Sequence, residues 1–455
     1  MPQNLKPQTL KPQTYDLLIK NGTLVNHDGT HRGDVAVIGE RVAAIGDLST
    51  AAGKEVIDAT GLHVLPGLID SQVHFREPGL EWKDNLETGA NAAVLGGICT
   101  VFEMPNTEPP TTTVAALQDK IARATGRMSC DFAFYAGGTH DNVDELVKME
   151  KMVGCAGVKV FMGASTGTLL VADDEGVARI INAINRRAAF HSEDEYRLLE
   201  RRPLARPGDW SSHPEVRDVE AAVSSTNRLL RIARAAGKRI HVLHISTAEE
   251  MEILKHNKDI ASVEVLPNHL TLAAPDAYER LKGKAQQNPP IREQRHQDAL
   301  WAALQAGIVD VLGSDHAPHT EEEKARPYPA SPSGTPGVQT MLPVMLTHVA
   351  NGKLSLERLV DLLCHGPQRV FGLADKGRMA VGYHGDFTLV DLAARRTITN
   401  DWIASKSKWT PFDGMEAKGW PVATIVRGRI VMRDDVIVAH GHGAPARFLE
   451  ALPIG

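Results

Sequence analysis

Hydrophobic and polar positions alternate in short runs near both ends of the chain. From Tyr15, the runs YDLLIKNGTLV and DVAVIGERVAAIG are separated by turns that contain glycine, and GDFTLVDL and ATIVRGRIVMRDDVIV repeat this pattern near the other end. Such alternation predicts β-strands. Neither end is long enough to bury a core alone. We therefore predict one small β-sandwich that combines residues 15–65 with residues 376–445.

Between these ends, apolar runs alternate with helical stretches. The runs are HVLPGLI, ICTVFEM, CDFAFYA, GVKVFM, AAFH, RIHVLHIS, SVEVLP and VDVLGS. Eight such units in roughly 300 residues predict an α/β fold, a (β/α)8 TIM-type barrel over residues 66–375. A doubly wound open sheet is the alternative, although no G-x-G-x-x-G motif follows the first run. Residues 1–14, with a tandem LKPQT, are predicted to form a disordered tail.

Composition and charge exclude several classes of protein. The chain has 455 residues, 42% of them hydrophobic, and a net charge of -6, which gives no support to a nucleic-acid or membrane-surface role. No apolar run approaches the roughly 18 residues that span a bilayer. The four cysteines form no C-x-x-C pair, and no secretory signal is evident. Buried free thiols in a cytoplasmic protein are therefore expected.

Polar side chains follow the ends of the predicted barrel strands. Active sites of this fold lie at the carboxyl ends of the strands, so residues at these ends are expected to share one rim. They are His74, Asn106, Lys159, His191, His244 and Asp315. This gathering of metal-binding and acid–base residue types predicts a catalytic site.

Lys159 lies inside the apolar run GVKVFM. Burial there would lower the lysine pKa and favour the neutral amine. A neutral amine can react with carbon dioxide to give a carbamate, an anionic ligand with two oxygens that could bridge two metal ions. The simpler alternative is a lysine whose stem reaches water from the end of the strand.

His191 and His244 each end an apolar strand. Two imidazoles and a carbamate oxygen make three protein ligands with an open position, which is the pattern of a catalytic zinc. His241 would face the other side of its strand, and His244 is preferred because it lies nearer the carboxyl end of the strand. Asp315 in SDHAPH could accept a proton from water and deliver it to a leaving nitrogen.

Two further motifs bear on the chemistry. Arg76 points to the same side of an extended chain as His74 and offers a planar fork for a carboxylate. The run GASTG fits G-x-S-x-G, the nucleophile elbow of serine hydrolases. That motif requires an immediate helix, and TLLVADDEG intervenes here, which argues against Ser165 as a nucleophile.

The motifs together resemble those of the dihydroorotases of the amidohydrolase superfamily. The matching runs, in order from about Tyr15 to Val438, are DSQVHFREPG, EMPNTEPPTT, GVKVFMGASTG, HSEDE, HVLHIST, QNPPIR, GSDHAPH and GVQTMLP. The resemblance implies a metal-dependent barrel with a flanking sandwich. It also implies reversible cyclisation of N-carbamoyl-L-aspartate to L-dihydroorotate, the third step of pyrimidine synthesis.

The resemblance also implies roles for individual residues. Zinc, one or two ions per chain, would be held by carboxylated Lys159 together with His74, His191, His244 and Asp315. Asp315 would also be the catalytic acid and base. The substrate carboxylate would be bound by Arg76, Asn106 and His319, and Asn288 would contact the ring. A homo-oligomer acting on a small molecule is expected.

Two residues, Arg76 and Gln72, bear on which substrate the protein uses and on how many metal ions it holds. Allantoinases have Asn at the position of Arg76, and hydantoinases and dihydropyrimidinases lack the arginine, so Arg76 favours dihydroorotate. The family's first strand usually reads His-x-His, whereas this chain reads Gln72-Val-His74. Gln72 could leave one metal weak or absent, bind metal through its oxygen, or act as a second-layer hydrogen-bond donor. A non-catalytic subunit that associates with aspartate transcarbamoylase is the third functional alternative.

Overall fold

A computed structural model describes residues 14–165 and 169–449. The predicted tail over residues 1–14 lies outside this part, except that Thr14 begins the first strand. In the described part, no helix is long and apolar enough to cross a membrane. The four cysteines are free and buried, as the sequence predicts.

Eight parallel strands follow one another in sequence order around the molecule. They are β6 (Leu68–Val73), β7 (Ile98–Glu103), β8 (Asp131–Gly137), β9 (Cys155–Phe161), β10 (Ala188–His191), β11 (Ile240–Val242), β12 (Ala261–Val265) and β13 (Val311–Leu312). A parallel bridge between Val73 and His316 joins the first strand to the segment after the last. The predicted TIM-type barrel is thus confirmed, and the open doubly wound sheet is excluded by the strand order.

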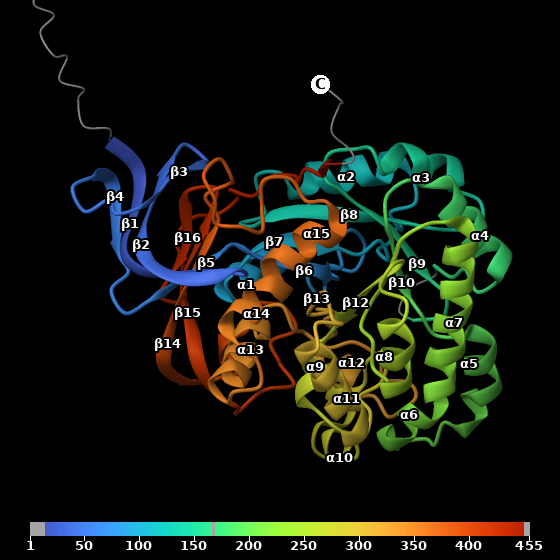
Figure 1. Ribbon diagram of the computed structural model, residues 1–455. Coiled ribbons are helices and arrows are strands. Elements are labelled where there is room, and N and C mark those ends of the chain that lie inside the picture. Colours follow the sequence, from blue (N-terminus) through green and yellow to red (C-terminus); the bar gives the residue numbers. More distant parts are fainter. Residues whose placement is uncertain (1–13, 166–168, 450–455) are drawn as a thin grey trace, which may run out of the picture.

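Helices cover the barrel (Figure 1). They are α1 (Leu86–Leu95), α2 (Val114–Ala124), α3 (Val143–Met149), α4 (Asp174–Ala183), α5 (Glu195–Arg201), α6 (His213–Val216), α7 (Val219–Ala236), α8 (Ala248–Lys255), α9 (Pro267–Thr271), α10 (Asp276–Leu281), α11 (Gln294–Gln305), α12 (Glu321–Lys324), α13 (Met341–Ala350), α14 (Leu356–Val360) and α15 (Gly366–Phe371). Their ends follow the sequence. Asp218, for example, caps the first turn of α7, and Gly237 ends that helix at a φ of 62°.

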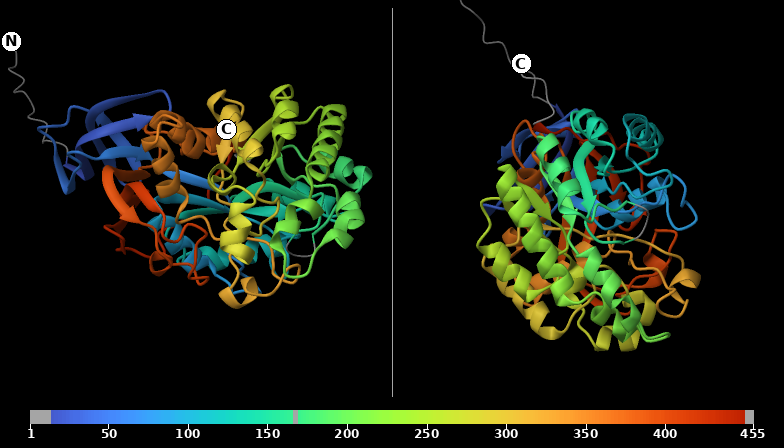
Figure 2. Two further views of the ribbon diagram at one scale, coloured as in Figure 1. Left: turned by 90° about the horizontal axis from the view of Figure 1, so that it is seen from below. Right: turned by 90° about the vertical axis from the view of Figure 1, so that its right-hand side faces the viewer.

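The two ends of the chain form a second, nine-stranded sheet. Its strands are β1 (Thr14–Asn26), β2 (Gly29–Ile38), β3 (Arg41–Gly46), β4 (Ala52–Asp58), β5 (His63–Pro66), β14 (Phe387–Thr397), β15 (Glu416–Val426), β16 (Arg429–Arg433) and β17 (Val436–Ile437). The N-terminal and C-terminal strands lie together at one end of the molecule in both figures (Figures 1 and 2). They share one hydrophobic core, to which Leu17, Val35, Phe387 and Ile425 contribute. The hydrogen bonds make this one continuous sheet; the boundaries predicted for the two domains stay predictions.

The run HVLPGLI, predicted as one strand, is divided between the two sheets at Gly67. β5 pairs with β14, whereas β6 enters the barrel. A Cβ atom at Gly67 would lie 2.4 Å from the Cβ of Asp386, so glycine is needed where the chain crosses from one sheet to the other. This crossing fixes the start of the strand that leads to His74.

Candidate active site

A pocket lies where the carboxyl ends of the barrel strands meet. Its lining residues are Gln72, His74, Arg76, Asn106, Lys159, Phe161, Ser165, His191, His244, Asn288, Asp315, Ala317, Ser333 and Gly334. All the residues predicted for the site except His319 are among them. Lys159 is within β9, His191 is the last residue of β10, and His74 follows β6 directly.

The backbone is left-handed at three of these positions. The φ angles are 67° at Arg76, 38° at His244 and 46° at Asp315. Residues other than glycine adopt this region at a cost, and such strain gathers at functional sites. At all three positions it falls where the chain leaves a barrel strand, and each side chain lines the pocket.

Gln72, His74 and Asp315 form one group in the pocket. Oδ1 of Asp315 lies 3.0 Å from Gln72 Nε2 and 3.1 Å from His74 Nε2. The other ring nitrogen of His74 is 2.8 Å from Asn106 Oδ1. When Nδ1 donates to Asn106, the lone pair of Nε2 faces the Asp315 carboxylate, and burial lowers the pKa of His74. Two acceptors that face each other in this way leave a position for a shared cation.

His191 and His244 form a second group. His191 Nε2 is 2.8 Å from Glu193 Oε2, and Arg217 pairs with the same carboxylate. A hydrogen bond from Nε2 to Glu193 leaves Nδ1 of His191 facing the pocket, 3.1 Å from His244 Nε2. The attraction of Arg217 and His191 outweighs burial and keeps the pKa of Glu193 well below its usual value. Glu193 therefore stays ionised and fixes the orientation of the His191 ring.

Lys159 lies in the same pocket as both groups and is 1% exposed. Burial lowers the pKa of Lys159 to about 7, although the negative charges of Asp315 and Glu264 oppose this shift. Its ammonium contacts the ring of Phe161, 4.5 Å from the centroid. Because of the lowered pKa, a large fraction of this lysine is neutral at neutral pH. That is the form which carbamate formation requires.

The donor set fits a metal ion only with a contribution from Lys159. Among the described residues, no three His, Cys, Asp or Glu side chains converge as a metal site. However, Oε1 of Gln72 and Nδ1 of His244 are buried without a hydrogen-bond partner. Orphaned polar atoms are rare in proteins. Together with the facing acceptors of His74 and Asp315, they leave unused coordinating capacity in the pocket.

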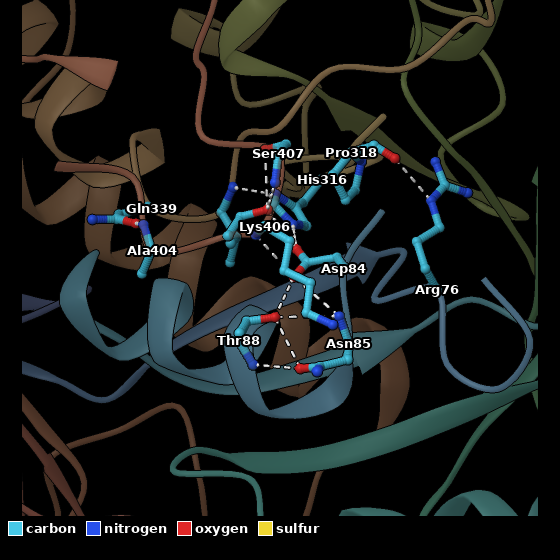
Figure 3. A network of polar contacts seen from close by, with 12 residues as sticks. Arg76, Asp84, Asn85, Thr88, His316, Pro318, Gln339, Ala404, Lys406 and Ser407 are labelled. Atoms are coloured by element: carbon cyan, nitrogen blue, oxygen red, sulfur yellow. Dashed lines mark hydrogen bonds and ion pairs between the residues drawn. The ribbon is translucent and has the colours of Figure 1, made fainter. Parts of the chain in front are cut away.

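Arg76 forms the part of the pocket that is suited to an anion. Its Nε donates to Pro318 O over 3.1 Å (Figure 3), and the side chain is 1% exposed. Burial lowers the pKa of Arg76 to about 10, so the guanidinium stays charged at neutral pH. A buried cation beside a cavity favours an anionic ligand.

His319 lies behind Arg76, outside the pocket lining. Its Nε2 is 3.3 Å from the Arg76 guanidinium and 3.0 Å from Ser333 O, and its Nδ1 is 3.1 Å from Lys83 Nζ. Burial keeps the pKa of His319 well below its usual value. As placed, this neutral ring supports Arg76 and the chain around Ser333.

A second network holds the segment after β13 in place. His316 Nε2 is 3.1 Å from Asp84 Oδ2, which also accepts from the Ser405 hydroxyl over 2.6 Å. The backbone of Gly337 donates to the other ring nitrogen of His316. Figure 3 shows His316 and Asp84 meeting, with Arg76 reaching Pro318 nearby. Asp315 therefore lies between backbone segments that are fixed from several sides.

Several pocket residues were not predicted from the sequence. They are Phe161, Ala317, Ser333 and Gly334, and Ser165 was considered only as a nucleophile. Residues 166 and 167 of that motif lie outside the described part of the chain. The segment TEEEKARPYPASPSGTPG is rich in proline, glycine and charge, which is typical of a mobile rim loop. It contains α12 and the buried side chains of Lys324, Ser331 and Thr335. Glu193, which holds the His191 ring from outside the pocket lining, was not predicted either. Its sequence signal is its place in the run HSEDE, two residues after His191.

Comparison with known proteins defines the class. Residues 63–431 match the model of the amidohydrolase family. A dihydroorotase of Methanosarcina acetivorans is 35% identical over 96% of this chain and 95% of its own length. A dihydroorotase of Bacillus subtilis is 35% identical over 92% and 99%. The chain belongs to the amidohydrolase family, and the predicted resemblance to its dihydroorotases is confirmed.

Related cyclic-amide enzymes are similar as well. An L-hydantoinase of Paenarthrobacter aurescens is 34% identical over 94% of this chain and 97% of its own length. The solved L-hydantoinase of Arthrobacter aurescens has a TM-score of 0.91 at 32% identity, covering 95% of this chain and 99% of that one. A dihydropyrimidinase of Brevibacillus agri gives 0.86 at 30% identity, with 94% and 97% covered. The fold is thus common to enzymes named for different substrates, and side chains in the pocket must distinguish them.

Proposed function

We propose that this protein is a dihydroorotase, which interconverts N-carbamoyl-L-aspartate and L-dihydroorotate. The observation that carries this proposal is the buried guanidinium of Arg76 in the wall of a pocket that also contains Lys159 and Asp315. A cyclic amide with a free carboxylate uses both parts, whereas a hydantoin or a dihydropyrimidine has no carboxylate for Arg76. The 34–36% identity to several dihydroorotases supports the same substrate.

We propose zinc, one or two ions per chain, as the cofactor. Its protein ligands would be a carbamate on Lys159 together with His74, His191, His244 and Asp315. Gln72 would contribute its unpartnered oxygen or remain beside the site. When bound, the metal would lower the pKa of a water molecule and polarise the amide carbonyl.

Asp315 moves the proton in this mechanism. In the hydrolytic direction its carboxylate accepts a proton from the attacking water and delivers it to the ring nitrogen as the C–N bond breaks. The biosynthetic direction reverses both transfers, and water leaves. The contacts of Asp315 Oδ1 with Gln72 and His74 fix the carboxylate in the pocket.

Arg76 and Asn106 hold the substrate carboxylate, and Asn288 contacts the ring. Asn106 and Asn288 both line the pocket. His319 contributes through Arg76. Holding the ring at one end supplies orientation, because the amide carbonyl is then brought to the same place in each turnover.

The decisive experiment measures metal content and dihydroorotate hydrolysis on one purified sample. We expect turnover with about one to two metal ions per chain, which is the number that the proposed ligands would hold. About one ion per chain would assign a site-depleting role to Gln72. Metal without turnover on dihydroorotate, but with turnover on allantoin or hydantoins, would contradict the proposal. No metal and no turnover after reconstitution with zinc and bicarbonate would favour a non-catalytic subunit.

Replacing Arg76 with glutamine tests the substrate directly. We expect kcat/KM for dihydroorotate to fall by about 100-fold or more, because a charge-assisted, bidentate contact is lost. Hydrolysis of a ring without a carboxylate should not fall in parallel. Arg326→Gln removes the same charge from an exposed position and should leave the kinetics unchanged. Equal losses on both kinds of ring in Arg76→Gln would show that the arginine does not read the carboxylate.

The remaining assignments follow from this activity. We propose a role in pyrimidine synthesis in the cytoplasm; the four buried free thiols fit a reducing compartment. The partner is a small-molecule substrate. A homo-oligomer and an association with aspartate transcarbamoylase are tested by measuring the mass of the purified protein with and without that enzyme.

A further inference from the structure

The rim segment, residues 320–337, contains a buried lysine outside the proposed catalytic machinery. Lys324 is 2% exposed. Its Nζ donates to three backbone carbonyls: Gln286 at 3.0 Å, Pro332 at 2.7 Å and Gly334 at 2.8 Å. Burial lowers the pKa of Lys324, whereas its three backbone acceptors favour the protonated ammonium, which alone has three hydrogens to donate. The side chain is therefore used completely, and all of its hydrogen bonds go to backbone.

These three carbonyls belong to the two segments that form one wall of the pocket. Gln286 lies two residues before Asn288, and Pro332 and Gly334 flank Ser333; Asn288, Ser333 and Gly334 all line the pocket. The amide of Gly334 also donates to Gln286 O over 2.9 Å. Lys324 thus holds the two segments against each other.

The carbonyl between the two bound ones is also occupied. Ser333 O accepts from His319 Nε2 at 3.0 Å, so three successive carbonyls are bound by two side chains. The chain cannot shift toward Ala317, because a Cβ at Gly334 would lie 2.5 Å from Ala317 O. The position of the wall is consequently set by Lys324 on one side and by His319 on the other.

We propose that Lys324 is a positioning residue that sets the distance between the wall at Ser333–Gly334 and the rest of the pocket, and so governs substrate affinity. This inference rests on the proposed dihydroorotase function. Without the ammonium, three buried carbonyls lose their donor and the segments separate to find others. A wall that moves away weakens binding of the ring but leaves Asp315 and Lys159 in place.

The test compares Lys324→Met with Lys284→Met. Both ammonium groups lie near the ring of Trp409, at 5.8 and 5.4 Å, but Lys284 pairs with the exposed Glu321. We expect Lys324→Met to raise KM for dihydroorotate about 10-fold with kcat changed less than about threefold. Lys284→Met should match the wild type. An unchanged KM in Lys324→Met, or a loss in kcat alone, would overturn the proposal.

Hydrogen exchange gives a readout that needs no substrate. The amide of Gly334 should exchange about 10-fold faster or more in Lys324→Met, since its acceptor at Gln286 is no longer held. If the wild-type protein does not turn over dihydroorotate, only the proposed function is refuted. If exchange at Gly334 is unchanged in Lys324→Met, the positioning role is refuted. If Lys324→Met does not fold, Lys324→Gln, which retains two donors, decides by the same two measurements.

Discussion

Replacing Asp315 with asparagine is expected to lower kcat for dihydroorotate hydrolysis by about 1,000-fold, within the range that general acid–base groups contribute. The amide occupies nearly the same space, so its contacts with Gln72 and His74 can persist. It cannot accept a proton from water at neutral pH. Metal content should stay close to the wild-type value, because the other proposed ligands are intact. Steady-state kinetics with metal analysis on the same sample measure both quantities.

Asp310→Asn is the matched control for this substitution. Asp310 lies five residues earlier, before β13, and pairs with Lys258 and Arg369 away from the pocket. The control removes an equivalent charge and should keep its turnover. Turnover within tenfold of wild type in Asp315→Asn, at equal metal content, would assign the proton transfer to another group.

The barrel and most of its rim could be predicted because parallel strands impose a common direction. Once apolar runs separated by helices are taken as successive strands, their carboxyl ends must meet. His74, Lys159 and His191 then fall at one rim with no knowledge of tertiary structure. His244 was preferred to His241 because it lies nearer the carboxyl end of its strand. In the structure His244 lines the pocket, while His241 contacts Ser262 in the interior.

The remaining features depend on contacts between distant parts of the chain. His319 was predicted to bind substrate, but its position behind Arg76 is set by Lys83 and Ser333, 236 and 14 residues away in sequence. Proline, glycine and charge in the rim segment suggested mobility. The single buried Lys324 reverses this interpretation, since one ammonium satisfies three carbonyls. Local composition contains no signal for such a contact.

Replacing Lys159 with methionine is expected to remove both metal and turnover. Methionine has a similar length and volume but cannot form a carbamate, so the two groups of ligands lose the oxygens that would join them. We expect kcat to fall by more than about 1,000-fold, because metal activation of water is lost, with metal content near background. Lys120→Met is the control, as Lys120 is also buried but pairs with Glu103 behind the barrel wall. Normal metal content in Lys159→Met would contradict the assignment.

The same substitution should stabilise the metal-free protein, which distinguishes loss of a ligand from misfolding. Burial lowers the pKa of Lys159 from 10.5 to about 7 in the folded state. Between these values the unfolded chain binds more protons, so this lysine makes the free energy of unfolding rise with pH. The folded protein is therefore destabilised fully below about pH 7, and this penalty disappears as the pH rises from about 7 to about 10.5. With chelator and without carbon dioxide, urea unfolding at pH 7 should show Lys159→Met to be more stable than wild type. The difference should shrink toward higher pH; a less stable variant at pH 7 would mean that the ammonium is held by favourable contacts and is not poised as a neutral amine.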